Sequence, residues 1–452
     1  MLDKELLDFQ KKIIVLDDDP TGTQTVHDVF VYTNWETDTL KKAFLHKDKL
    51  FFILTNSRSF SAAHTKEVHA KIAENILCAA QETNQEFIII SRGDSTLRGH
   101  FPLETQILKD TLESHSPLRY DGEILCPFFE EGGRFTFDNI HYIKDGDTLI
   151  PAGETEFAKD KSFGYTSSHL GEYVAEKSDG LYKKEDCTYI SLEELHAGDI
   201  DAITNKLLLV TDFNKIIVNA MTYSDLEIFT TAWIRAMRLG KNFLVRSAAA
   251  LPKIIGNIHQ IPLLTKKEVT NPALSTGGII IIGSHVKKTT QQFHALLELK
   301  EDLQFIEFDV NTYFSEGSLE SETTRILALC NTFIASGKSV VIYTSRDLKV
   351  PDTTDKDEIL ALSVKISDAL TKIVNLLQVQ PQFIIAKGGI TSSDVATKGL
   401  CIKRALVLGQ IKPGIPVWKT QEESKFPGTP YIVFPGNVGE ITTLKEIVEE
   451  LI

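Results

Sequence analysis

The chain has 452 residues, a length that suggests two or three domains. Its residues are 42% hydrophobic and 24% charged, which is typical of a globular protein. Its formal net charge of −14 disfavours broad binding of DNA or RNA. No run reaches the roughly 18–20 apolar residues of a membrane helix, and the acidic N-terminus lacks a signal-peptide pattern. We therefore expect a cytoplasmic protein with neither nucleic-acid nor membrane partners. The five scattered cysteines indicate neither a disulfide framework nor a zinc site.

Short apolar runs that end abruptly in polar residues or glycine recur along the chain and predict buried strands. They lie at residues 13–16, 51–54, 87–90, 216–218, 243–245, 279–282, 340–342 and 383–385. Continuous runs of this length suit strands that are covered on both faces. Amphipathic stripes at residues 68–80, 226–237 and 359–377 predict helices between the strands. The alternation predicts an α/β fold of two domains, each built on a mostly parallel sheet flanked by helices.

A domain boundary is expected where prolines, glycines and charged residues concentrate, between residues 251 and 277. We predict a first domain over residues 1–260 and a second over residues 261–452. Residues 128–200 are less regular and predict a long excursion from the first domain. Because open α/β sheets bind ligands beyond the carboxyl ends of their strands, the polar residues after each strand are candidates for the site.

An acidic loop follows the first predicted strand, with the sequence Asp-Asp-Asp-Pro-Thr-Gly at residues 17–22. Carboxylates this close repel one another and need cations, hydrogen-bond donors or a metal ion. In a functional interpretation, one aspartate is a base or binds a hydroxyl, and Gly22 lets a ligand approach. In a structural interpretation, an aspartate caps the turn.

Two basic loops follow the next predicted strands, at residues 55–59 and 91–100. Arginine can bind a carboxylate through two parallel hydrogen bonds, while hydroxyls and Asp94 suit a polyol. The mixture predicts a sugar acid as ligand. The alternative for Arg98 and His100 is a structural pair near the start of a helix.

Two further arginines are weaker signals. Arg134 either meets an anion or pairs with Glu130 or Glu131. Arg246 opens the run at residues 246–249, which follows a predicted strand; a ligand role and a helix cap are equally consistent with this run.

Three glycine-containing loops follow strands of the second domain, at residues 283–284, 387–394 and 434–439. Glycines there allow backbone N–H groups to reach a phosphate, so the loops predict a nucleotide site. Residues 336–339 look like the end of a P-loop, but they lack its upstream glycine and precede a strand, so we expect a turn. No G-x-G-x-x-G follows the first strand, which argues against a dinucleotide enzyme.

Taken together, the motifs at residues 18–22, 94–99, 283–284 and 388–391 resemble the four-carbon acid sugar kinase family, formerly a domain of unknown function. Residues 23–29 and 389–414 resemble its longer-chain branch. The resemblance implies a substrate-binding first domain, a nucleotide-binding second domain and an active site in the cleft between them. It also implies that ATP and Mg²⁺ serve to phosphorylate a terminal hydroxyl of threonate, erythronate or 3-oxo-tetronate.

The loops predict catalytic and substrate-binding residues, and the resemblance implies the nucleotide-binding ones. Asp19 and Asp94 would be catalytic, by orienting the substrate hydroxyl and accepting its proton. The substrate-binding residues would be Asp18, Arg58, Arg92, Ser95 and Arg98, and one of the three arginines would hold the substrate carboxylate. The nucleotide-binding residues would be Ser284, Gly388, Gly389, Ile390, Thr391 and Gly436. The particular acid, the metal ligands and the oligomeric state, a homodimer included, stay open.

Two other functions are consistent with the same loops. One is a metal-dependent lyase or aldolase that acts on a similar acid and uses the aspartates as Mg²⁺ ligands. The other is a sensor that binds a nucleotide or a sugar acid without catalysis.

Overall fold

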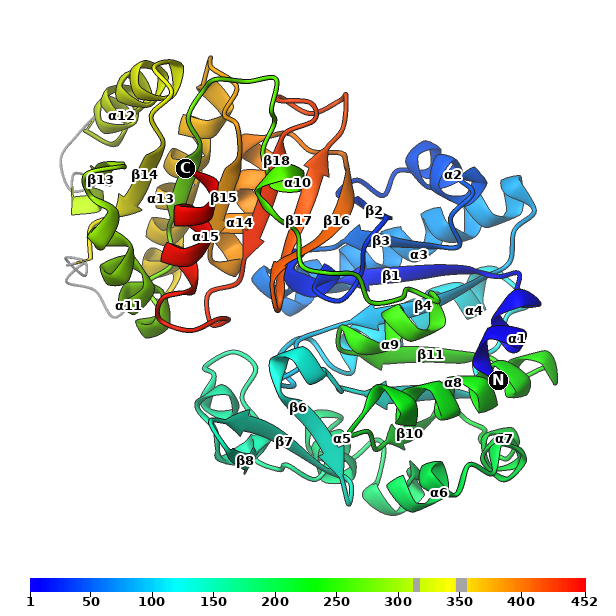
Figure 1. Ribbon diagram of the computed structural model, residues 1–452. Helices are drawn as coiled ribbons and strands as arrows, with labels where there is room; N and C mark the ends of the chain where they lie inside the picture. Colours follow the sequence, from blue (N-terminus) through cyan, green and yellow to red (C-terminus); the bar gives the residue numbers. More distant parts are fainter. Residues whose placement is uncertain (312–317, 347–355) are drawn as a thin grey trace. The chain divides into compact units, whose positions relative to one another are not determined.

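The computed structural model describes residues 1–311, 318–346 and 356–452, with the backbone alone described for residues 318 and 356–364. The chain divides into two compact units, Met1–Gln260 and Ile261–Ile452 (Figure 1). Within the described ranges, no helix is long and apolar enough to cross a membrane.

The first unit is built on a parallel sheet with the strand order β2-β3-β1-β4-β11-β5-β10-β9. Its strands are β1 (Lys12–Asp17), β2 (Val29–Tyr32), β3 (Leu50–Leu54), β4 (Phe87–Arg92), β5 (Gly122–Cys126), β9 (Thr188–Ile190), β10 (Asn214–Val218) and β11 (Phe243–Ser247). The strands predicted from the apolar runs are confirmed, and nearly all of their residues are buried.

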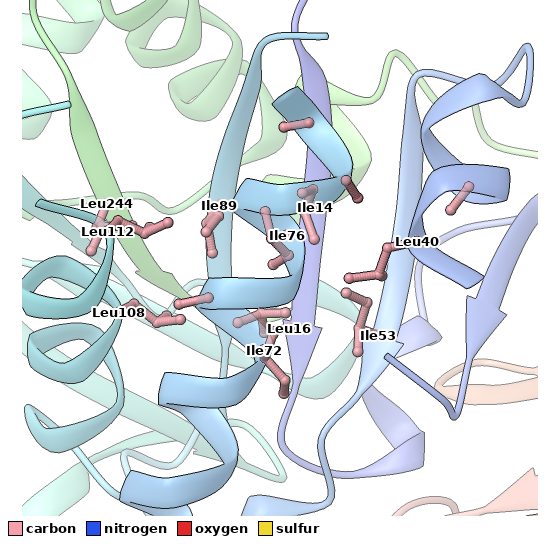
Figure 2. Packing of buried hydrophobic residues seen from close by; sticks show 14 of the residues in the cluster. Ile14, Leu16, Leu40, Ile53, Ile72, Ile76, Ile89, Leu108, Leu112 and Leu244 are labelled. Carbon is pink, nitrogen blue, oxygen red and sulfur yellow. The ribbon is translucent and has the colours of Figure 1, made fainter. Parts of the chain in front are cut away.

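Helices flank this sheet. They are α1 (Leu2–Leu7), α2 (Thr37–Leu45), α3 (Ala62–Thr83), α4 (Leu103–His115), α5 (Leu170–Lys177), α6 (Leu192–Ala197), α7 (Ile200–Leu208), α8 (Tyr223–Arg238) and α9 (Ala250–Ile255). On one face of the sheet, Ile72 and Ile76 of α3 pack with Ile14 of β1 and Ile89 of β4 (Figure 2). Fully burying an aliphatic side chain stabilises the fold by about 1.5–3 kcal/mol, so this cluster fixes the strands that carry the site.

The irregular stretch after β5 forms a small antiparallel sheet of β6 (Arg134–Phe137), β7 (Ile140–Asp145) and β8 (Thr148–Pro151). Together with α5 it encloses a separate apolar cluster that includes Tyr165, Tyr173 and Leu97. Leu97 belongs to the loop after β4, so the excursion packs against that loop.

The second unit has the strand order β13-β14-β12-β15-β18-β17-β16, parallel from β13 to β18 and antiparallel beyond. Its strands are β12 (Ile279–Ile282), β13 (Gln304–Phe308), β14 (Val340–Thr344), β15 (Ile384–Lys387), β16 (Arg404–Lys412), β17 (Ile415–Thr420) and β18 (Pro430–Phe434). Its helices are α10 (Lys266–Val269), α11 (Lys287–Leu296), α12 (Ser318–Ala335), α13 (Lys356–Leu376), α14 (Gly389–Asp394) and α15 (Thr443–Leu451). Residues 336–339 connect α12 to β14, which confirms the predicted turn.

Each sheet has a topological switch point, where the strands that follow lie on opposite sides of one central strand. In the first unit, β1 lies between β3 and β4, and in the second unit β12 lies between β14 and β15. Ligands of open α/β sheets bind beyond the strand ends at such a switch point. The acidic and glycine loops predicted as sites follow β1, β12 and β15, at these two points.

Candidate functional site

The acidic loop begins where β1 ends, at Asp17. Asp19 caps a short 3₁₀ turn, Pro20–Thr23, because its Oδ1 accepts a hydrogen bond from the Thr21 backbone N–H (2.8 Å) and another from the Thr21 hydroxyl. The structural interpretation of the loop is therefore confirmed. A Cβ atom at Gly22 would overlap the Asp17 carboxylate, so the close approach that this glycine allows is made by Asp17 itself.

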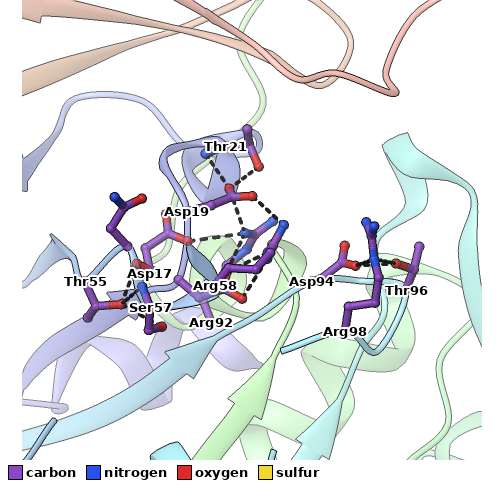
Figure 3. Close-up of polar contacts among 12 residues, drawn as sticks. Asp17, Asp19, Thr21, Thr55, Ser57, Arg58, Arg92, Asp94, Thr96 and Arg98 are labelled. Carbon is purple, nitrogen blue, oxygen red and sulfur yellow. Dashed lines mark hydrogen bonds and ion pairs between the residues drawn. The ribbon is translucent and has the colours of Figure 1, made fainter. Parts of the chain in front are cut away.

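Two arginines neutralise the buried aspartates (Figure 3). Arg58, which follows β3, donates to both oxygens of Asp18 (Nε–Oδ2 3.1 Å and Nη2–Oδ1 2.6 Å) and to Asp19. The Nη1 atom of Arg92, at the end of β4, lies 3.2 Å from Asp17, 3.5 Å from Asp18 and 3.6 Å from Asp19. These guanidinium groups provide positive charge that three neighbouring carboxylates need.

The surroundings shift the pKa values of the three aspartates in different directions. Burial raises the pKa of Asp17 well above its ordinary range, despite the nearby Arg92 charge. Burial also raises the pKa of Asp18. For Asp19, burial alone would raise the pKa, but the Arg58 and Arg92 charges and the Thr21 hydrogen bonds outweigh it and lower the pKa. Asp19 is therefore ionised at neutral pH and can accept a hydrogen bond from a hydroxyl.

A second charged group follows β4. Arg98 donates through Nε to Asp94 (2.6 Å), and the Thr96 hydroxyl also donates to this carboxylate. Burial opposes ionisation of Asp94, but the Arg98 and Arg58 charges and the hydrogen bonds outweigh it and hold its pKa well below the usual range. Because the Arg58 charge acts on both Asp19 and Asp94, the two predicted catalytic carboxylates belong to one electrostatic cluster.

The Asp94 loop is held by three donors, and none of them was predicted to support this loop. His141 Nε2 lies 2.8 Å from the Ser95 carbonyl oxygen, and the hydroxyls of Tyr165 and Tyr173 donate to the carbonyls of Thr96 (2.8 Å) and Leu97 (2.9 Å). Burial lowers the pKa of His141 to about 4, so the ring is neutral at pH 7. The three donors occupy three consecutive carbonyls and fix the path of the loop.

Arg246, at the end of β11, is bound by a buried glutamate. Its Nη1 atom donates to Glu104 of α4 and to the Ser91 hydroxyl (2.9 Å), and the Ser57 hydroxyl donates to Glu104 (2.5 Å). The helix that follows, α9, has Ala249 at its N-cap position and no side-chain cap, so the helix-cap alternative for residues 246–249 is wrong. A cavity of about 10 Å³ beside Arg246 and Asp94 has room for a water molecule but not for a sugar acid.

The predicted pairing of Arg134 with a neighbouring glutamate is also wrong. Glu131 instead accepts hydrogen bonds from the Tyr223 hydroxyl (2.8 and 2.7 Å) and lies 3.6 Å from the Lys253 ammonium. Neither Glu130 nor Glu131 forms an ion pair with Arg134 in the part of the chain that the structure describes.

The three glycine loops of the second unit converge at the end of β12 and β15. A Cβ atom added to Gly283 would lie 2.5 Å from the Thr391 hydroxyl oxygen, and one added to Gly388 would lie 2.9 Å from the Ser284 Cβ. A Cβ at Gly436 would lie 3.5 Å from the Ser284 hydroxyl oxygen. Four of the predicted nucleotide-binding residues, Ser284, Gly388, Thr391 and Gly436, therefore lie together, and Ile390 beside them is 64% exposed.

Lys387, the first residue of the predicted glycine loop at residues 387–394, lies buried beside these loops. Lys387 is fully buried, and its Nζ atom donates to the Pro435 carbonyl (2.5 Å) and lies 3.8 Å from the centre of the Phe434 ring. Burial lowers its pKa to about 6. Lys387 thus ties the end of β15 to the loop after β18 and helps to hold the glycine loops together.

Comparisons with known protein families agree with this division of the chain. A family model described as a sugar-binding N-terminal domain matches residues 13–255, and one described as a nucleotide-binding C-terminal domain matches residues 279–444. The chain is therefore a two-domain α/β protein with a sugar-binding unit and a nucleotide-binding unit. It belongs to the four-carbon acid sugar kinase family.

Two solved structures share the fold over nearly the full chain. One, with the provisional name tRNA synthase, is from Salmonella typhimurium LT2; it is 16% identical, with 96% of this chain and 97% of that chain covered and a TM-score of 0.67. The other, HI1011 of Haemophilus influenzae from family DUF1537, is 18% identical, with 96% and 99% covered and a TM-score of 0.60. A search of curated proteins found no match to the chain.

Proposed function

We propose that the protein transfers the γ-phosphoryl group of ATP to a hydroxyl of a small four-carbon sugar acid, such as threonate, erythronate or 3-oxo-tetronate. The observation that carries this proposal is the cluster of ionised aspartates and arginines at the switch point of the sugar-binding unit. The glycine loops at the switch point of the nucleotide-binding unit support it. The proposal places the reaction in the cytoplasm, where ATP is available.

In this proposal, Asp19 and Asp94 orient the hydroxyl that receives the phosphoryl group. Both are ionised at neutral pH, so each can accept the hydroxyl proton in a hydrogen bond and direct a lone pair of the oxygen toward phosphorus. Their low pKa makes them weak bases. A weak base suffices because phosphoryl transfer depends mainly on positioning and charge stabilisation.

The other predicted substrate residues shape the charge around these two. Arg58 and Arg92 keep Asp19 ionised, and Arg98 does the same for Asp94. Asp18 is bound by both oxygens to Arg58 and fixes the plane of its guanidinium group. Ser95 contributes its backbone carbonyl to the support of the loop and its hydroxyl to the predicted polyol contacts.

ATP would bind at the second unit through Ser284, Gly436 and the backbone of residues 388–391, where the glycines leave room for phosphate. Mg²⁺ would supply positive charge on the phosphates. The residues present also fit a hard cation: Asp17, Asp18 and Asp19 offer oxygens within 4.8 Å of one another, and Asp17 Oδ2 is buried without a hydrogen-bond partner among the described residues.

The direct test is ADP release by the full chain with Mg-ATP and a panel of acids. The panel would contain the D and L forms of threonate and erythronate, 3-oxo-tetronate, five-carbon acids and lactones. We expect ADP release with at least one four-carbon acid and none without an acid. Conversion of an acid in the absence of ATP would instead indicate a lyase or aldolase, and tight binding without turnover would indicate a sensor.

Asp19→Asn tests the assigned role of this carboxylate. Asparagine still caps the turn, but it is a neutral, poorer acceptor for the hydroxyl proton. We expect turnover to fall at least about 100-fold while ATP affinity, measured by calorimetry, is unchanged. Asp145→Asn, a change at an exposed residue of the small sheet, is the control and should keep wild-type turnover. Undiminished turnover in Asp19→Asn would refute the role.

A further inference from the structure

Arg134 lacks the counter-charge that every other arginine of the cluster has. Carboxylates of the protein itself bind the guanidinium groups of Arg58, Arg92, Arg98 and Arg246. The side chain of Arg134 forms no hydrogen bond or ion pair with any residue in the ranges that the structure describes, and its Nε atom is buried. Among the described residues, the Arg134 guanidinium group therefore has no direct counter-ion.

The position of Arg134 on β6 directs its side chain toward the Asp94 loop. Thr136 lies two residues further along the strand, so the two side chains share a face. The Thr136 hydroxyl lies 2.9 Å from His141 Nδ1, and His141 Nε2 lies 2.8 Å from the Ser95 carbonyl. The face that carries Arg134 is thus the one that packs against the loop of Asp94.

The charges around Arg134 agree with this direction. Burial lowers the pKa of Arg134, and the Asp94 carboxylate, which raises it, offsets part of that effect. The Arg98 charge acts on Arg134 as well, in the lowering direction. Arg134 is therefore near enough to the predicted hydroxyl-binding carboxylate to act on the same small ligand, but it is not paired with that carboxylate.

The backbone holds Arg134 firmly. Its N–H donates to the Phe129 carbonyl (2.9 Å), and its carbonyl accepts from the Phe129 N–H (3.0 Å). Gly133, just before it, adopts a left-handed conformation with φ of 72°, which turns the chain into β6. The backbone of Arg134 is therefore already ordered before an anion binds, and only the side chain has freedom to lose.

An arginine that is largely buried with no acceptor destabilises the folded protein, and such groups often mark binding sites. We propose that Arg134 binds the carboxylate of the sugar acid while Asp94 and Asp19 hold its hydroxyls. This inference rests on the proposed function, because it concerns the same substrate class. It makes Arg134 the residue that selects an acid over a neutral polyol, and it leaves Arg58, Arg92 and Arg98 to organise the aspartates.

The test measures binding and not turnover, so that it stands apart from the kinase assay. Calorimetry without ATP would compare threonate and erythronate with threitol and erythritol, the matched polyols that lack a carboxylate. The full-length wild-type chain is expected to bind its preferred acid at least about 30-fold more tightly than the matched polyol, as befits a charge-assisted bidentate contact. Arg134→Met should remove this preference, and Arg134→Lys should retain part of it.

Arg119→Met is the matched control, because Arg119 is exposed and its guanidinium group donates only to backbone carbonyls such as that of Ser116 (3.0 Å). It should keep the wild-type preference, and thermal melts should show all variants folded. If Arg134→Met binds acids as tightly as the wild type, or loses acid and polyol affinity equally, the inference is wrong. It is also wrong if the wild type binds no acid of the panel. If the wild type binds acids through Arg134 but releases no ADP, the inference stands and the proposed kinase activity falls.

Discussion

At the scale of single residues, the site is governed by how carboxylates and arginines compensate one another. Asp17, Asp18 and Asp19 are adjacent and buried, an arrangement that would be costly without Arg58 and Arg92. The compensation is uneven: Asp19 stays ionised, whereas the pKa of Asp17 is raised. Acceptance of the hydroxyl proton is therefore assigned to Asp19, and Asp17 has a supporting role.

Gly22→Ala tests that supporting role. The new methyl group would overlap the Asp17 carboxylate, which is packed beneath the loop and cannot move without disturbing Arg92. We expect the free energy of unfolding to fall by about 1–3 kcal/mol and acid binding to weaken at least tenfold, with ATP binding unchanged. Urea unfolding and calorimetry would measure these effects.

Gly180→Ala is a control for that substitution, because a Cβ atom at Gly180 meets no atom within 4 Å. Its left-handed backbone carries a cost of about 1 kcal/mol, but acid affinity should be unchanged. Equal acid affinity in Gly22→Ala and the wild type would show that the position of Asp17 is unimportant for binding.

At the scale of elements, the sequence predicted what is local and missed what is distant. The strand ends at residues 17 and 387 and the turn at residues 336–339 were predicted, because apolar runs and turn residues can be recognised within a few consecutive residues of the sequence. The antiparallel strands β16 and β17 were not predicted. The ion pair between Arg246 and Glu104 was missed as well, because it joins β11 to α4 and no local sequence pattern predicts such a contact.

The small sheet and its neighbourhood were the least predictable part of the site. Residues 128–200 predicted an irregular excursion, yet they provide His141, Tyr165 and Tyr173, the donors that hold the Asp94 loop. Each is separated from its partner by more than 40 residues. Apolar or neutral side chains of this kind are also common in cores, so only the folded structure distinguishes their role.

Tyr165→Phe and Tyr173→Phe test whether these donors position the loop. Each change leaves a buried carbonyl without its donor, which should cost about 0.5–1.5 kcal/mol of stability. We expect the double variant to bind the acid at least tenfold more weakly, because Asp94 is no longer held in place, while ATP affinity is unchanged. Calorimetry with both ligands would measure this difference.

Tyr182→Phe serves as the control for the tyrosine variants. The Tyr182 hydroxyl donates to the Gln106 side chain (3.0 Å) and not to the Asp94 loop, so its loss should leave acid affinity unchanged. If the double variant behaves like this control, the loop does not depend on its donors.

At the scale of the whole molecule, the two units have separate apolar cores. The clusters around Ile72 and Tyr173 belong to the first unit, and the cluster around Ile280 and Phe434 belongs to the second. Tryptophans report on each unit separately, because Trp35 and Trp233 lie in the first and Trp418 lies in the second. The stability of the sugar-binding unit can therefore be followed in a Trp418→Phe background.

The buried His141 makes the stability of that unit dependent on pH. Its pKa falls from an ordinary value of 6.5 to about 4 on folding, so the unfolded chain takes up the proton first. The contribution of His141 to stability is complete above pH 6.5 and is lost as pH falls from 6.5 through 4, by roughly 3 kcal/mol. The pKa of Asp94 is lowered from an ordinary value of 3.8, so the stability that this carboxylate contributes is lost only as the pH falls below 3.8.

His141→Gln should flatten the pH dependence between 6.5 and 4. Glutamine can still donate to the Ser95 carbonyl but does not titrate. In the Trp418→Phe parent background, urea unfolding followed by Trp35 and Trp233 emission should therefore show a smaller loss of unfolding free energy between pH 6.5 and 4 than the parent shows. Part of the loss should persist, because burial also lowers the pKa of His69 in the same unit. His64→Gln, at an exposed residue of α3, should retain the full parental loss. An identical loss in His141→Gln and its parent would mean that His141 is not held neutral against the Asp94 loop.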